Sequence, residues 1–362
     1  MTGTSMSGRE ARELIEKVIS GLRNLEITIQ EDTAESIISM DVWDWSQGVG
    51  LFSLYLYYKE TGNPELLDYL TSWFDRHLAR GLPEKNVNTM CPLLTLGYLY
   101  EETGNPDYLR VCREWADYAA FEMPRTPESG ITHTAVDSPN EGELWDDTLY
   151  MTVLFMGRMG VLLHEPEFVD ESVRQFLVHL KYLTDTETGL FFHGWTFKEN
   201  HHFAGARWGR GNAWYTAGLV DYLDMVPVPR GVKMFLLSSL ERQAGKLAEL
   251  QAASGMWRTL LDDPSSYEET SATAGFAYGI LKAVRKGYLD ERFRETGLRA
   301  LKAVVERIDD KGAVQGVSYG TRMGRTLEFY KSIPVCPMPY GQSMALLMLA
   351  ESLHHLPSDQ KN

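Results

Sequence analysis

The 362-residue chain has few cysteines, few basic residues and no long apolar run, and each shortage excludes a class of protein. Cys91, Cys112 and Cys336 are odd in number, far apart and set in apolar segments, which predicts reduced core thiols rather than a disulfide framework or a zinc ribbon. No apolar run reaches the roughly 18 residues of a membrane helix, and the N-terminus lacks the basic and apolar regions of a signal peptide. We therefore expect a cytoplasmic protein with no membrane partner.

Basic side chains are outnumbered, because 35 Lys and Arg residues face 50 Asp and Glu residues and give a net charge of −15. This balance argues against binding to a nucleic-acid backbone or to an anionic membrane surface. Hydrophobic residues make up 44% of the chain and aromatic residues 11%, which is ample material for a large core. No segment with linker composition divides the chain, so we expect one domain over residues 1–362, as a monomer or a homodimer.

A helix–hinge–helix unit repeats along the chain. In segment 59–64 a glycine closes one helix and a proline opens the next, and the hinge recurs 42 residues later at 101–106 and in a looser form at 164–166. Repeats of this length indicate stacked helical hairpins. Apolar helices that alternate with amphipathic ones are expected to begin at 45–47, 88–89, 146–148, 211–212, 270–271 and 341–343.

Six apolar and six amphipathic helices predict an all-α fold, an (α/α)6 toroid in which the apolar helices form the inner ring. All six inner helices would then direct their N-termini at one mouth. Helix N-termini carry unpaired N–H groups and the positive end of the helix dipole. The mouth therefore suits a small anionic ligand such as a carboxylate.

The segment 143–151 is the strongest candidate for catalysis. Asp146 and Asp147 open an apolar helix, a position where a carboxylate accepts backbone N–H groups and meets the helix dipole. Burial and a neighbouring carboxylate both raise a pKa, which allows a carboxyl group to keep a proton near neutral pH. The alternative is a plain helix cap. Adjacent helical residues diverge by about 100°, so the two cannot flank one glycosidic bond as a carboxylate pair.

A second candidate region, 191–214, concentrates what a sugar-acid site needs. Trp208 and Trp214 can stack on the apolar face of a sugar ring, and Arg210 offers a planar fork to a carboxylate. His193 follows two phenylalanines and is either a ligand contact or a structural residue. Core packing is the alternative for the tryptophans.

Three further stretches complete the candidates. His133, close before the paired carboxylates, is a weaker candidate for substrate contact. Trp43 belongs to a Trp-Asp-Trp triplet that is either a second sugar platform or a packed helix cap, with packing favoured for Asp44. The histidines in 199–202 lack zinc-type spacing, so we expect a solvated loop there, with no metal and no cofactor.

Four motifs together resemble glycoside hydrolase family 105, the unsaturated rhamnogalacturonyl hydrolases, over most of the chain. They are Trp-x-Asp-Thr-Leu-Tyr-Met at 145–151, Arg-Trp-x-Arg-Gly-Asn-Ala-Trp at 207–214, His-Gly-Trp at 193–195 and Trp-Asp-Trp-x-Gln-Gly at 43–48. The resemblance implies an (α/α)6 barrel in which Asp147 is the general acid/base and Asp146 occupies a variable place. It also implies a subsite for the unsaturated uronic acid lined by four residues of the second region, His193, Trp208, Arg210 and Trp214.

One position departs from a related family pattern. In the similar unsaturated glucuronyl hydrolases a second Asp lies on the preceding inner helix, whereas this sequence offers Asn88 there. Asn88 is therefore a candidate substrate contact. The departure weighs against a scheme with two carboxylates.

The resemblance implies hydration of a double bond rather than ordinary glycoside hydrolysis. A pectin lyase leaves a 4,5-double bond in the terminal uronic acid; Asp147 would protonate C4, water would add at C5, and the hemiketal would open to release the attached sugar. The alternatives are a conventional (α/α)6 glycosidase, a sugar epimerase, an unsaturated glucuronyl hydrolase acting on glycosaminoglycan fragments, and a helical-repeat scaffold without catalysis. Closure of the ring separates a toroid from an open scaffold.

Overall fold

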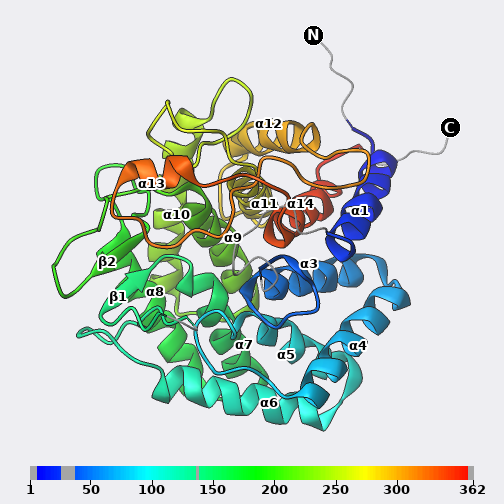
Figure 1. Cartoon of the computed structure of the whole chain (residues 1–362), viewed down its shortest axis with the longest axis vertical. Coiled ribbons are helices and arrows are strands. Elements are labelled where there is room, and N and C mark those ends of the chain that lie inside the picture. The colour runs from blue at the N-terminus through cyan, green and yellow to red at the C-terminus, as the bar shows by residue number, and fades with distance from the viewer. Residues whose placement is uncertain (1–5, 26–36, 136–137, 358–362) are drawn as a thin grey trace.

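A computed structural model describes residues 6–25, 37–135 and 138–357 (Figure 1). The predicted hinges form as expected. Gly62 ends α3 (Trp45–Thr61) with φ +67°, and its N–H donates to the carbonyl of Tyr58 at 2.7 Å. Asn63 then caps α4 (Pro64–Arg80) by accepting from the N–H of Glu65 at 3.1 Å.

The same hinge connects the two helices within the second hairpin, and a variant of it does so within the third. Gly104, at φ +68°, separates α5 (Cys91–Thr103) from α6 (Pro106–Asp117). His164, at φ +57°, takes the place of the glycine between α7 (Leu154–Leu162) and α8 (Pro166–Leu183). The looser copy of the repeat therefore keeps the left-handed backbone without the glycine.

The remaining hairpins include one that joins the two ends of the described chain. Its inner helix is α14 (Pro339–Ser352) and its outer helix is α1 (Gly8–Arg23), which packs its apolar stripe on α14. The side chain of Gln342 donates to the backbone carbonyl of Val18 across this contact at 3.1 Å. The other two hairpins pair α9 (Gly209–Met225) with α10 (Arg230–Leu250) and α11 (Thr270–Arg285) with α12 (Arg294–Val305).

The inner helices form a closed ring. In order around it, α3 packs on α5, α5 on α7, α7 on α9, α9 on α11, α11 on α14, and α14 returns to α3. Each inner helix also packs against its own outer helix, and α9 is buried on every side along most of its length. The (α/α)6 toroid is confirmed, and closure excludes an open helical scaffold.

A short β-ribbon interrupts the helical pattern at the mouth. β1 (Glu143–Trp145) pairs antiparallel with β2 (Gly194–Thr196), and Leu144 lies opposite Trp195. The ribbon brings the two candidate regions side by side. The short helices are η1 (Tyr118–Glu122), η2 (Leu149–Val153), η3 (Glu291–Phe293) and α13 (Leu327–Ser332).

The predictions drawn from the few cysteines and from the lack of a long apolar run can be compared with the structure. Cys91 and Cys112 are buried thiols as expected, whereas Cys336 is only half-buried. Among the described residues, no helix combines the length and the apolar character needed to cross a bilayer.

Candidate active site

The neighbouring carboxyl groups of Asp146 and Asp147 face different surroundings. Asp146 is fully buried against the first turn of α9, where a Cβ on Gly211 would lie 1.9 Å from Asp146 Oδ2, so only glycine fits. Asp147 lies beside His133, with its Oδ1 3.2 Å from His133 Nδ1, and its side chain is 17% exposed. Of the two, Asp147 is the acid that a ligand can reach.

Both carboxyl groups have raised pKa values. Burial raises the pKa of Asp146 well above its ordinary value, and the charge of Asp147 adds to this. Burial also raises the pKa of Asp147, while His133 and Arg210 oppose the shift. Among the described residues, neither Asp146 oxygen nor Asp147 Oδ1 has a hydrogen-bond partner, and η2 has no side-chain cap. These features favour a proton-holding acid over a plain helix cap.

His133 supports the acid from one side. Its ring stacks on Trp145 with the centroids 4.2 Å apart, and its Nδ1 lies 2.9 Å from the hydroxyl of Thr148 as well as close to Asp147. Burial lowers the pKa of His133, although the carboxylate of Asp147 opposes that shift. The structure therefore places this histidine against Asp147.

His193 is fixed next to the same carboxylates through its backbone. Its carbonyl accepts from the N–H of Asp146 at 3.0 Å, and its N–H donates to the carbonyl of Ala206 at 2.9 Å. The imidazole is buried, with its centroid 4.3 Å from that of Trp208. Within the described part of the chain, Nε2 of His193 and Nε1 of Trp208 have no hydrogen-bond partner.

Arg210 has a structural role that the sequence did not predict. Its side chain is 1% exposed, and its guanidinium donates to the carbonyl and the hydroxyl of Ser318 and, at 2.8 Å, to the hydroxyl of Thr321. The same group lies 4.7 Å above the rings of both Trp208 and Tyr340. It therefore ties the loop after α12 to the start of α9, and its Nε has no hydrogen-bond partner among the described residues.

Aromatic side chains connect the starts of four inner helices. Trp214 of α9 lies 4.9 Å from Tyr150 and 6.3 Å from Trp45 of α3, measured between ring centroids. Trp45 in turn stacks on Tyr340 of α14 at 4.7 Å. These rings form an apolar wall at the mouth.

Trp43 occupies the packed position that was one of the two alternatives for its motif. This residue is 6% exposed and stacks on Trp73 with the centroids 5.3 Å apart, while its indole N–H donates to the carbonyl of Thr89 at 2.9 Å. With its ring covered and its N–H satisfied, Trp43 is a packing residue. Trp45, two residues later, is the tryptophan of this motif that belongs to the aromatic wall.

Asn88 and Asp44 lie at the N-termini of neighbouring inner helices. Asn88 is half-buried just before α5, and Val87 beside it is held by the backbone of Thr134 and the hydroxyl of Thr152. Asp44 caps α3 by accepting from the N–H of Trp45 at 2.7 Å, as favoured from the sequence. Burial raises the pKa of Asp44 to about 6.

The sequence matches a known enzyme family over most of its length. The profile of Glycosyl Hydrolase Family 88 matches residues 22–356. The chain belongs to this family. It is 34% identical to the unsaturated rhamnogalacturonyl hydrolase YesR of Bacillus subtilis over 342 residues, which cover 93% of this chain and 95% of that protein.

Solved structures give the same result for this family 88 protein. A crystal structure from Salmonella enterica serovar Paratyphi A, described as a possible member of the GH105 family, has 43% identity and a TM-score of 0.93, covering 98% of this chain and 96% of that chain. The unsaturated glucuronyl hydrolase of Bacillus sp. GL1 shares the fold at 18% identity and a TM-score of 0.72, over 94% and 96% of the two chains. The resemblance to family 105 and the assignment as a glycoside hydrolase are confirmed.

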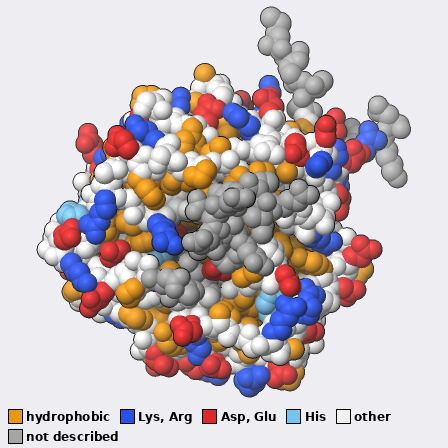
Figure 2. Space-filling model, viewed as in Figure 1, with side chains coloured by type: hydrophobic (Ala, Val, Ile, Leu, Met, Phe, Trp, Pro, Cys, Tyr) orange, Lys and Arg blue, Asp and Glu red, His pale blue; other side chains and the backbone are white. Residues whose placement is uncertain are grey.

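The face of the family 88 protein that carries the β-ribbon and α13 is shown in Figure 2. Charged side chains of both signs gather along its outline, and hydrophobic ones lie nearer its centre. On its loops, exposed His201 lies 2.6 Å from Glu199, which also pairs with Arg325. In the described ranges no group of three or more His, Cys, Asp or Glu side chains is arranged to hold a metal ion.

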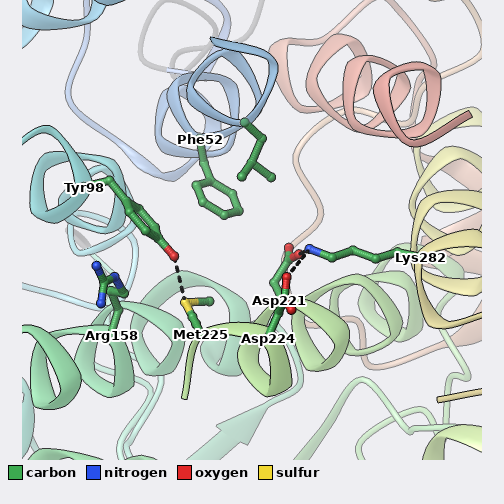
Figure 3. A pocket seen from close by; sticks show the side chains of 8 residues that line it. Phe52, Tyr98, Arg158, Asp221, Asp224, Met225 and Lys282 are labelled. Atoms are coloured by element: carbon green, nitrogen blue, oxygen red, sulfur yellow. Dashed lines mark hydrogen bonds and ion pairs between the residues drawn. The ribbon is translucent and has the colours of Figure 1, made fainter. Parts of the chain in front are cut away.

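The opposite end of the toroid holds a cavity of about 300 Å³ among the C-terminal halves of the inner helices (Figure 3). Asp221 accepts there from Lys282 at 2.5 Å and from the hydroxyl of Tyr278 at 2.6 Å. Arg158 pairs with Glu101. This cavity contains none of the residues expected to bind substrate.

Proposed function

We propose that this family 88 protein removes the 4,5-unsaturated uronic acid from the non-reducing end of pectic rhamnogalacturonan fragments produced by a lyase. The proposal rests on one observation above the others. Asp147 is a partly exposed acid with a raised pKa, while its neighbour Asp146 is directed into the protein. A single accessible acid suits hydration of a double bond. The name of the Bacillus subtilis relative supports the same substrate class.

In the proposed reaction Asp147 begins protonated and transfers its proton to C4 of the enol ether. Water then adds at C5 and returns a proton to the same carboxylate, so that the acid is restored. The hemiketal opens at its C5–O5 bond to a ketone, which leaves a hemiacetal at C1. This hemiacetal collapses to an aldehyde, and the attached sugar leaves with the hydroxyl proton. His133, which contacts Asp147 Oδ1, orients the carboxyl group during both proton transfers.

Substrate binding is assigned to the groups around this acid. Trp214 and Trp45 provide the apolar wall for the sugar ring. His193, Trp208 and Arg210 each carry a ring or guanidinium nitrogen without a hydrogen-bond partner among the described residues, and these nitrogens are the donors for the carboxylate and hydroxyl oxygens of the uronic acid. Asn88 is a further polar contact from the start of α5.

A conventional glycosidase is the less favoured function. It needs two carboxyl groups that flank the anomeric carbon. Asp146 is packed against Gly211, and Asp44 is occupied in capping α3. Neither carboxyl group is therefore free to serve as the partner of Asp147.

The deciding experiment follows the ultraviolet absorbance of the conjugated double bond with an unsaturated rhamnogalacturonan disaccharide. A glycosaminoglycan-derived unsaturated disaccharide and a saturated glycoside serve as matched substrates. We expect the absorbance to fall with the first substrate and the saturated glycoside to stay intact. Hydrolysis of the saturated glycoside at a comparable rate would contradict the hydration mechanism, whereas preference for the second substrate would change only the assigned sugar.

The cytoplasmic location, the single domain and the monomeric or dimeric state stay predictions for this protein. They bear on where the substrate is met, because a cytoplasmic enzyme would act on fragments that have already been imported. Size measurement in solution and fractionation of cells test them directly.

A further inference from the structure

Tyr330 of α13 connects a distant part of the chain to His193. The tyrosine is fully buried, and its ring packs in a small cluster with Ala206, Trp208 and Leu260. Its hydroxyl oxygen lies 2.7 Å from Nδ1 of His193, 137 positions earlier in the sequence. The role of Tyr330 is not predictable from the motifs, because α13 carries no recognisable repeat.

The hydrogen-bond partners of this hydroxyl determine where its proton lies. The backbone N–H of Gly324 donates to the tyrosine oxygen at 3.0 Å and occupies one lone pair. The single hydroxyl proton can then go to His193 Nδ1 or to the sulfur of Met323, which is 3.8 Å away. An imidazole nitrogen is a better acceptor than a thioether sulfur, and it is closer. The hydroxyl therefore donates to Nδ1.

We propose that Tyr330 is a positioning residue that holds His193 in the tautomer with its proton on Nε2. In this tautomer Nδ1 accepts from Tyr330, and Nε2–H is left as a donor without a partner in the described part of the chain. Its use on a uronic acid oxygen rests on the proposed function, but the tautomer itself does not.

The surroundings keep both groups in the required protonation states. Burial, followed by the neighbouring His133 and Arg210, lowers the pKa of His193 well below its ordinary value, so the ring is neutral at physiological pH. Burial raises the pKa of Tyr330, so the hydroxyl keeps its proton. A neutral ring has one donor and one acceptor, and Tyr330 selects which nitrogen is the donor.

The consequence is a donor that is fixed before substrate arrives. With the proton on Nδ1, the ring would present a lone pair at Nε2 and repel a substrate oxygen. The loop between α12 and α14 also holds Arg210 through Ser318 and Thr321. One segment of the chain therefore orients two groups that both contact the ring of Trp208.

The first test is direct and needs no substrate. Nitrogen-15 NMR of the histidine-labelled protein, with the His193 signals assigned through His193→Gln, distinguishes a protonated ring nitrogen from a bare one. We expect His193 to show a protonated Nε2 and an unprotonated Nδ1 throughout the neutral pH range. A protonated Nδ1 in the unmodified protein would overturn the inference, even if the enzyme hydrolyses the expected substrate.

The second test removes the hydroxyl alone. Tyr330→Phe should lower kcat/KM by about 3- to 10-fold, the size of one neutral hydrogen bond, and should allow both His193 tautomers to appear by NMR. Tyr222→Phe is the matched control, since Tyr222 of α9 is also fully buried and its hydroxyl bonds to the hydroxyl of Ser172 of α8 at 2.8 Å. The control should leave the His193 spectrum and kcat/KM unchanged.

A double variant separates positioning from general stability. If Tyr330 acts through His193, adding Tyr330→Phe to His193→Gln should cost almost nothing further in kcat/KM. Equal losses in the presence and absence of His193 would show that Tyr330 is merely structural and would overturn the inference. Failure of the unmodified enzyme on every unsaturated substrate would refute the proposed function, while the NMR result would still decide the tautomer.

Discussion

The two ends of the toroid both bury charged groups, but they satisfy them differently. At the C-terminal end of the inner ring, Asp221 accepts from Lys282 (Figure 3) and also from the hydroxyl of Tyr278. At the mouth, both oxygens of Asp146 and Oδ1 of Asp147 are buried and have no hydrogen-bond partner among the described residues. Asp221 Oδ2 and Arg158 Nε at the C-terminal end also lack a hydrogen-bond partner in the described part of the chain, so the two ends differ in that Asp221 has the cationic partner Lys282. The C-terminal end has a distinct cavity, whereas the proposed catalytic acid lies at the mouth.

The direction of the inner helices explains part of this difference. Their C-terminal ends favour cations, and Lys282 and Arg158 lie there. Their N-terminal ends favour anions, and the carboxyl groups of Asp44, Asp146 and Asp147 lie there, all with raised pKa values. Burial at the mouth thus outweighs the helix dipole, which keeps acid available for proton transfer.

The largest expected effect is at the accessible acid of the mouth. Asp147→Asn should lower kcat by about 10²- to 10⁴-fold, because it keeps the shape of the side chain and removes the transferable proton. Steady-state kinetics measure the loss, and the melting temperature should stay nearly unchanged. Asp146→Asn is the matched control and should keep activity within a few-fold. The opposite ranking of the two variants would place the catalytic acid at Asp146.

Arg210→Lys should have the next largest effect on rate. Loss of the planar fork should cost about 10- to 100-fold in kcat/KM, the value of a charge-assisted hydrogen bond. The melting temperature should also fall, because Ser318 and Thr321 lose their donor. Carboxylate recognition is separated from this structural role by comparing the free acid with its methyl ester. Equal losses on both substrates would leave Arg210 with the structural role alone.

The pH dependence should sharpen the contrast between the neighbouring carboxyl groups. As pH rises through the raised pKa of Asp147, kcat/KM should fall, because the acid form is consumed. Asp146→Asn should keep this profile, since the amide imitates the protonated form that burial imposes on Asp146. If Asp146→Asn abolished the fall in kcat/KM at alkaline pH, the titrating group would be Asp146 and not Asp147.

The stability of the protein should also depend on Asp146. Its folded pKa is raised, so the folded state binds the proton more tightly than the unfolded chain, whose Asp pKa is about 4. The stabilisation is fully present below that value and is lost as pH rises through the folded pKa. Melting temperatures of Asp146→Asn and the unmodified protein should therefore diverge in favour of the variant as pH increases through this window. A constant difference across it would contradict this sign.

The smallest effect on rate is expected at the C-terminal end. Lys282→Met leaves Asp221 buried without its ion-pair partner and should destabilise the fold by about 3–5 kcal/mol. At temperatures where the variant stays folded, kcat/KM should remain within a few-fold of the unmodified value. Denaturant unfolding together with kinetics measures both. A loss of activity larger than the loss of folded protein would show that the two ends are functionally coupled.

Much of the fold was predictable because local rules carry it. The hinges at Gly62 and Gly104 need a left-handed backbone followed by a proline, and the sequence places the right residues at both. The apolar run that follows Asp147 likewise predicts a helix that is buried on most sides, as η2 and α7 are. The π-helical first turn, η2, was not predictable, because it depends on how this helix fits between its neighbours.

The site was predictable only where a motif marks it. Asp147, His193, Trp208 and Arg210 are brought together, as the resemblance implied. For Trp43 the sequence left a sugar platform and a packed position open, because two tryptophans two residues apart look alike in sequence; in the structure its ring is packed against Trp73. Tyr330 was missed, since its importance lies in a hydrogen bond across 137 residues that no local pattern encodes.

The pairing of α1 with α14 has a consequence during synthesis. α1 belongs to the hairpin whose inner helix is α14, so its apolar stripe lacks this partner until residues 339–352 have been synthesised. The ring can close only once α14 has left the ribosome. A circular permutant that begins between Gly62 and Asn63 and joins α14 to α1 through a linker would make that contact local in sequence. In such a rearranged chain the end-to-end contact moves from α1 and α14 to α3 and α4, while the mouth stays the same.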